Sequence, residues 1–92
     1  MNRNALVRAV AKRTDTTLRE AAAMVDATLA VVIEALARGE SVRLPRFGEF
    51  AVRERAARVG RNVRTGETVS IPARLVPVFR PGKALREAVA GK

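Results

Sequence analysis

The sequence of 92 residues contains no cysteine, histidine, tyrosine or tryptophan, and its aromatic content of 3% consists of three phenylalanines. Without cysteine there is no disulfide framework and no thiolate that could bind a metal or act as a nucleophile. Without histidine, the usual general base near neutral pH and the commonest metal ligand are both missing. We therefore predict a protein that is not an enzyme and that needs no metal or other cofactor.

Long apolar runs are also missing. The apolar stretches are short and interrupted by Arg, Asp and Glu, so none approaches the roughly 18–20 residues that span a bilayer, and none resembles a signal peptide. Residues 18–38, expected to form the longest helix, lack the Lys/Arg-rich polar face and aromatic anchors of a membrane-surface helix. These features predict a cytoplasmic protein without a membrane partner.

Basic residues, in contrast, are abundant and unevenly placed. The chain has 18 Lys and Arg against nine Asp and Glu, a net charge of +9. Residues 46–86 alone contain ten basic and three acidic side chains, whereas residues 1–45 contain seven and five. A concentrated positive charge points to a polyanionic partner, most often nucleic acid.

The first half of the chain has helical patterns. Residues 3–13 predict a short helix, and the apolar stripe over residues 18–38 predicts a longer one. Thr17 and Glu20 have the spacing of a capping box at its start, and Gly39 stands where a left-handed C-terminal cap belongs. Two helices joined by a short loop predict a helical hairpin over residues 1–39.

The pattern changes to that of strands at Glu40. Apolar and polar residues alternate on both sides of a turn at residues 45–48, as in an antiparallel sheet. Residues 53–76 have little to bury and recurring arginines, with a reversal near Asn62 and Thr65-Gly66, so we predict a long β-ribbon that projects as an arm. A short helix is expected at 83–90. The fold class is therefore α+β, with a three-stranded antiparallel sheet in residues 40–82.

A single chain of this size could bury only a thin core. The helical stripe and the phenylalanines therefore predict a core shared with a second chain. We assign to this core Val25, Leu29, Val32, Leu36, Phe47, Phe50 and Phe79.

Several short motifs make the sequence similar to a known family. They include Leu44-Pro45, Phe47-Gly48-Glu49-Phe50, the segment from Arg53 to Arg58, Gly60-Arg61-Asn62, Thr65-Gly66-Glu67, Ile71-Pro72-Ala73, Val76-Pro77, Phe79 and Gly82-Lys83-Ala84-Leu85. Through these motifs the chain resembles the bacterial HU/integration host factor family of histone-like DNA-binding proteins, and HU in particular. The resemblance covers residues 1–92 as a single domain. The resemblance implies an intertwined dimer whose arms reach around double-stranded DNA through the minor groove, largely without sequence specificity, and organise the nucleoid. The partner chain would be identical or a paralogue.

The resemblance also implies which residues contact DNA. Arm arginines would contact phosphates and groove edges, Asn62 and Val63 would lie at the tip, and further basic residues would lie on the sheet and its flanks, with Arg3 as an outer contact. The resulting set is Arg46, Arg53, Arg55, Arg58, Arg61, Asn62, Val63, Arg64, Arg74, Arg80, Lys83 and Arg86.

Two positions depart from the family pattern. Arg46 stands where a small residue, often glycine, is usual, and is expected to add a phosphate-directed charge and little else. Val63 stands where the family has a proline that wedges between base pairs, so reduced bending is expected. An RNA-binding or ribosome-associated protein is the alternative that the arginines themselves leave open; competition between duplex DNA and structured RNA would separate the two.

Overall fold

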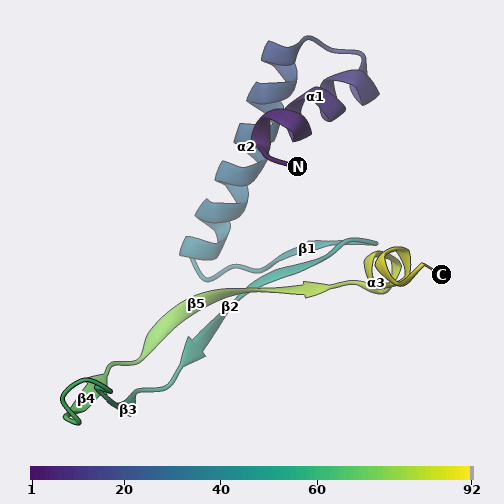
Figure 1. Cartoon of the computed structure of the whole chain (residues 1–92). Coiled ribbons are helices and arrows are strands. Elements are labelled where there is room, and N and C mark those ends of the chain that lie inside the picture. The colour runs from purple at the N-terminus through teal and green to yellow at the C-terminus, as the bar shows by residue number, and fades with distance from the viewer. Residues whose placement is uncertain (92) are drawn as a thin grey trace. The chain divides into compact units, whose positions relative to one another are not determined.

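The computed structural model describes residues 1–91. They divide into two compact units, residues 1–35 and the described residues from 36 onward, and each unit is described separately. The chain forms, in order, α1 (Arg3–Thr14), α2 (Leu18–Ala37), β1 (Val42–Leu44), β2 (Gly48–Arg55), β3 (Arg58–Arg61), β4 (Thr68–Ile71), β5 (Arg74–Pro81) and α3 (Lys83–Ala90). Figure 1 labels these elements. The predicted α+β class is confirmed, and the helix bounds differ from the predicted ones by one residue at most. No described helix is long and apolar enough to cross a membrane.

The first unit is a helical hairpin with side-chain caps. The Asn2 side chain accepts a hydrogen bond from the Ala5 backbone N–H at 2.9 Å, a helix start that the sequence pattern did not reveal. The predicted capping box is confirmed: Thr17 Oγ1 accepts from Glu20 N at 3.1 Å, and Glu20 Oε1 accepts from Thr17 N at 3.2 Å. Hydrogen bonds from the Thr17 hydroxyl and backbone lower the pKa of the Glu20 carboxyl.

The core of the hairpin is small. Its buried residues are Val7, Ala11 and Ala21, with Val10 and Val25 among the partly buried residues packed against them. No large side chain of the described residues is fully buried. Burial of apolar surface is the main favourable term in folding. Because the hairpin buries so few and such small side chains, a single chain gains little stability from this unit.

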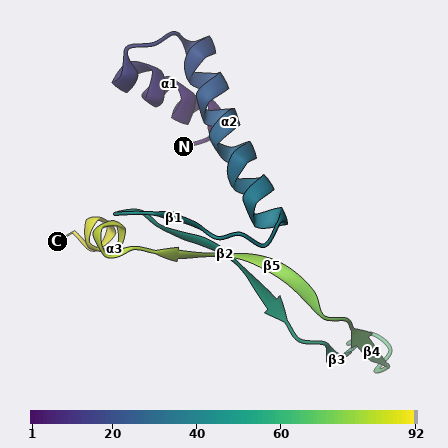
Figure 2. The same cartoon turned by 180° about the vertical axis from the view of Figure 1, so that it is seen from behind.

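The second unit contains a three-stranded antiparallel sheet in the order β1-β2-β5. The close approach of β5 requires a glycine at the start of β2, because a Cβ on Gly48 would lie 2.6 Å from both the Arg80 carbonyl oxygen and the Phe79 ring. Strands β2 and β5 pair from Gly48↔Pro81 as far as Arg55↔Arg74, and they run side by side in both Figure 1 and Figure 2. The predicted three-stranded sheet is confirmed.

The predicted arm consists of two ladders. β2 and β5 form its base, and β3 and β4 form a second two-stranded sheet with the register Arg58↔Ile71 to Arg61↔Thr68. Two unpaired residues on each strand, 56–57 and 72–73, separate the ladders, so the register continues unchanged across the break. Pro72 lacks an N–H and cannot donate to a ladder, which is a physical reason for the break.

Arg46 has a left-handed backbone, with φ at 72°. For a residue with a Cβ this conformation costs roughly 1–2 kcal/mol, whereas glycine adopts it freely. The expectation that Arg46 adds a charge and little else was therefore wrong, because this residue also strains the β1–β2 turn.

We predict that Arg46→Gly raises the free energy of unfolding by about 0.5–1 kcal/mol, because relief of the strain exceeds the entropic cost of glycine. Arg46→Ala is the matched control: it removes the same charge but keeps the Cβ. Denaturant unfolding at fixed protein concentration measures both. Equal gains for the two variants would assign the effect to charge, and no gain for glycine would contradict the strain.

An ion pair links the two helices of the hairpin. Arg3 donates from Nε to Asp26 Oδ1 at 3.0 Å and from Nη2 to Oδ2 at 2.7 Å. These bonds lower the pKa of the Asp26 carboxyl and raise that of the Arg3 guanidinium. Both side chains are about half exposed, so the pair contributes modestly.

The lowered pKa of Asp26 predicts a pH-dependent contribution to stability. The ion pair stabilises the fold above the ordinary pKa of an aspartate, and the contribution is lost as pH falls through the lower pKa of the folded state. Thermal unfolding followed over acidic pH should show this dependence weakened in Asp26→Asn but retained in Asp15→Asn. Asp15 is the control because it has no ion pair among residues 1–91. The same acid profile in wild type and Asp26→Asn would contradict the prediction.

Candidate nucleic-acid interface

Strand alternation gives the three-stranded sheet two different faces. Side chains of directly paired residues point to the same side, and successive residues point to opposite sides. One face carries Phe50 and its partner Phe79, and is called the apolar face. The other, called the basic face, carries five arginines and one acidic residue: Arg43, Arg53, Arg55, Arg74, Arg80 and Glu49.

The apolar face carries the aromatic cluster of the protein. The rings of Phe50 and Phe79 have centroids 4.7 Å apart, and that of Phe47 lies 5.4 Å from Phe79. Even so, Phe47 is 45% exposed and Phe79 is 39% exposed. Phenylalanines that cluster on one face yet remain this accessible present apolar surface that a partner could cover.

The other residues predicted to form a dimer core behave in the same way. Leu29 on α2 is 53% exposed, and Val25, Val32 and Leu36 are only partly buried. None of the seven predicted core residues is buried within the single chain. Except for Val25, which packs against the hairpin core, these side chains leave apolar surface that a second chain could cover, and their place in a shared core stays a prediction.

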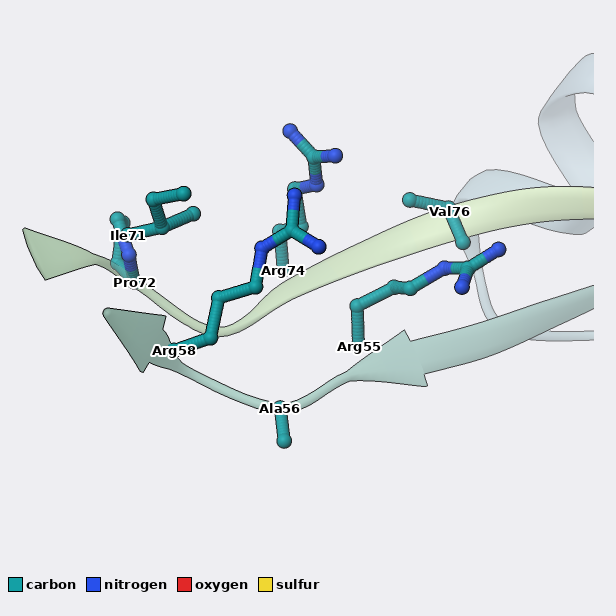
Figure 3. A pocket seen from close by; sticks show the side chains of 7 residues that line it. All are labelled: Arg55, Ala56, Arg58, Ile71, Pro72, Arg74 and Val76. Atoms are coloured by element: carbon teal, nitrogen blue, oxygen red, sulfur yellow. The ribbon is translucent and has the colours of Figure 1, made fainter. Parts of the chain in front are cut away.

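The basic face continues past the break onto the arm. In strict alternation Arg55 and Arg58 would point to opposite sides, since they are three residues apart. Figure 3 shows instead that the side chains of Arg55, Arg58 and Arg74 lie on the same side of the ribbon, whereas Ala56 points away. Together with Ile71, Pro72 and Val76 they line a hollow of about 290 Å³. The break thus adds Arg58 to the basic face.

The remaining predicted contacts lie elsewhere on the arm and its flanks. Arg61 follows Arg58 by three residues in the regular β3–β4 ladder, and so lies on the opposite face. Arg64 lies in the tip loop, defined as residues 62–67. Lys83 and Arg86 are in the first half of α3, where Lys83 Nζ is 3.9 Å from Glu87.

The tip loop is held by Asn62. Its backbone N–H donates to the Glu67 carbonyl, its carbonyl accepts from Gly66 N–H, and its side-chain Oδ1 accepts from Arg64 N–H at 2.9 Å. Asn62 therefore opens the loop and fixes its first turn, as Asx residues commonly do. Val63, which follows, is fully exposed.

The guanidinium groups of the arm are exposed and have no partner within residues 1–91. Among residues 1–91, no hydrogen bond or ion pair is made by the guanidinium groups of Arg53, Arg55, Arg58, Arg61, Arg64 and Arg74. All six are exposed. Exposed arginines without acidic partners can bind an external anion without first breaking an internal ion pair, and the planar guanidinium can bind phosphate through two hydrogen bonds at once.

Comparison with known proteins identifies the family. A family model described as "Bacterial DNA-binding protein" matches residues 1–90. The chain belongs to this family. DNA-binding protein HU 1 of Bacillus subtilis is 48% identical over 92 residues, covering 100% of both chains. DNA-binding protein HU of Streptococcus thermophilus is 54% identical over 88 residues, covering 96% of this chain and 97% of that one.

Solved structures of the family agree with the fold. An HU–DNA cocrystal structure from Anabaena matches with a TM-score of 0.94 at 47% identity, covering 100% of both chains. An HU mutant from Thermotoga maritima matches with a TM-score of 0.72 at 34% identity, covering 97% of this chain and 99% of that one. The resemblance seen in the sequence is confirmed. A family described as DNA-binding proteins also agrees with the prediction that this chain is not an enzyme.

Proposed function

We propose that this protein is a histone-like architectural protein that binds duplex DNA as a homodimer, through arginine-rich arms in the minor groove, and organises the nucleoid. The observation that carries the proposal is the basic face, which continues onto the arm through Arg58, together with the arm's unpaired guanidinium groups. The family is described as DNA-binding, and this favours DNA over the RNA-binding alternative.

The arm suits the minor groove for two physical reasons. A two-stranded ribbon with small residues such as Gly60 between its arginines is thin, and narrow A·T-rich minor grooves concentrate negative potential that attracts arginine. Phosphate contacts position a protein on DNA without reading its sequence. We therefore expect little sequence specificity, with Arg58 on one face of the ribbon and Arg61 on the other contacting different parts of the groove.

The homodimer is supported by the exposed phenylalanines and the half-exposed apolar stripe of α2. An isolated chain would leave this apolar surface in water, whereas a second copy offers the same surface in return, as in a two-fold interface. A paralogous chain would serve equally well if it carried the same residues. Sedimentation that shows a folded monomer at micromolar concentration would contradict the dimer.

We predict that DNA affinity falls steeply with salt and that Arg58→Ala flattens this dependence. Each phosphate contact contributes roughly 0.9 to the log–log slope, so the loss of one contact should reduce the slope by about that amount for each arm. The decrease should be similar for unrelated duplex sequences. Binding titrations over a salt series measure it.

Arg19→Ala is the matched control for this test. Arg19 is exposed on α2, has no ion pair among residues 1–91, and lies outside the proposed interface. Its substitution removes the same net charge and should leave the slope nearly unchanged. A nearly flat salt titration of the wild type, or equal effects of the two substitutions, would exclude the arm as the contact surface.

We further propose that Val63 makes this protein a weaker bender than a proline-tipped relative. Inserting a side chain between base pairs costs a few kcal/mol of unstacking. Val63 leaves an N–H whose burial between bases costs about 1–3 kcal/mol unless it finds an acceptor. Proline has no such donor and its φ is fixed. Most of the gain from insertion is therefore cancelled in the wild type.

Val63→Pro should then increase the bend angle while changing affinity only modestly, because the arginines provide most of the affinity. Energy transfer between the labelled ends of a short duplex measures the bend. Val63→Ala is the control, since it keeps the N–H but loses most of the apolar wedge, and it should bend DNA no more than the wild type does. Large and equal bends for wild type and Val63→Pro would show that valine inserts as effectively as proline.

A further inference from the structure

The basic face contains one row in which a carboxylate lies between two guanidinium groups. Glu49 on β2 is paired with Arg43 on β1 and with Arg80 on β5, so all three side chains point to the same side of the sheet. Arg43 Nη2 lies 3.4 Å from Glu49 Oε2. Glu49 is the one acidic residue among the paired positions of this face.

The same row borders a hollow at the β1–β2 turn. The hollow measures about 310 Å³, and its charged lining residues are Arg43, Arg46, Glu49 and Arg80. Three arginines at one hollow supply charge and hydrogen-bond donors of the kind that bind a phosphate group. The Glu49 side chain is 23% exposed whereas that of Arg43 is 79% exposed, so the carboxylate lies lower on the face and the guanidinium covers part of it.

We propose that this hollow is a phosphate-binding site of duplex DNA in which Glu49 competes with phosphate for Arg43. The inference rests on the proposed function, since it concerns DNA bound on the basic face. In the free protein Glu49 holds Arg43 across the sheet. When a DNA phosphate enters the hollow, Arg43 exchanges the carboxylate for the phosphate, and the uncompensated charge of Glu49 opposes further approach of the backbone.

This competition makes Glu49 a positioning residue that limits affinity. A sheet surface with arginines alone would bind any polyanion strongly. A carboxylate within the row makes the binding free energy of each phosphate at that point less favourable. Only DNA that also engages the arms would retain enough favourable contacts to bind tightly. Glu49 thus reduces binding to DNA that touches the sheet without entering the arms.

The experiment compares Glu49→Gln with Glu54→Gln. Both residues belong to β2 and both substitutions change the net charge by the same amount, but Glu54 pairs with Leu75 and points to the apolar face. Glu49→Gln should bind a short straight duplex about two- to fivefold more tightly, with a salt slope steeper by roughly 0.9 for each new phosphate contact. Glu54→Gln should change the affinity and the salt slope by only a small fraction of these amounts. Equal gains for the two variants would overturn the proposal, since they would show an effect of net charge alone.

A second pair of variants tests the role of Arg43. Adding Arg43→Gln to Glu49→Gln should abolish the gain in affinity, whereas adding Arg19→Gln, which removes the same charge from α2, should preserve it. If the gain in affinity persists without Arg43, or is lost equally in both double variants, the proposed exchange of partners at Arg43 is wrong. Thermal unfolding of each variant confirms that the proteins compared are folded.

The wild type provides an independent measurement that requires no substitution at Glu49. The side-chain Nε–H signal of Arg43, assigned from its absence in Arg43→Gln, should shift when duplex DNA is added. An unchanged signal at saturating DNA would overturn the proposal while leaving the arm model intact. If no DNA binding is detected at all, it is the proposed function that fails.

Discussion

The two-residue period of a β-strand, together with the register of β2 and β5, is the constraint on which the rest of this structure depends. Because paired residues share a side, one unbroken ladder from Gly48↔Pro81 to Arg55↔Arg74 places the phenylalanines on one face and the arginines on the other. A register shift of one residue would move every one of these side chains to the opposite face. The two surfaces proposed here, one for a second copy and one for DNA, are thus consequences of a single pairing.

The apolar face can supply stability without drawing on the basic face. A sheet with an open apolar face gains little from burial, and the helical hairpin buries only small side chains. Covering the apolar face with a second chain would provide the missing burial without using any side chain that faces the other way. The basic face then has no part in the core, and its arginines, apart from Arg43 with its partner Glu49, remain exposed and unpaired for an external anion.

Much of this arrangement could be predicted from the sequence, because local rules decide it. The capping box at Thr17, the glycine after α2 and the alternation around Phe50 each depend on residues close in the chain. The strain at Arg46 depends on the sign of φ in the turn, and the only indication of it in the sequence is that the family often has glycine at this position. The side on which Arg58 lies could not be predicted, because it depends on an irregular break in which alternation does not hold. The row of Arg43, Glu49 and Arg80 required a three-strand register that no local pattern reveals.

The break at residues 56–57 and 72–73 has a consequence for how the length of the arm can change in evolution. Since the same number of residues is unpaired on each strand, the partners beyond the break remain those of one uninterrupted hairpin. An insertion in only one strand at the break would place three unpaired residues opposite two, as in a β-bulge, and would leave the pairs of β3 with β4 unchanged because the tip loop closes them. The break can therefore absorb a change on one strand, whereas lengthening either ladder requires matched residues on both strands.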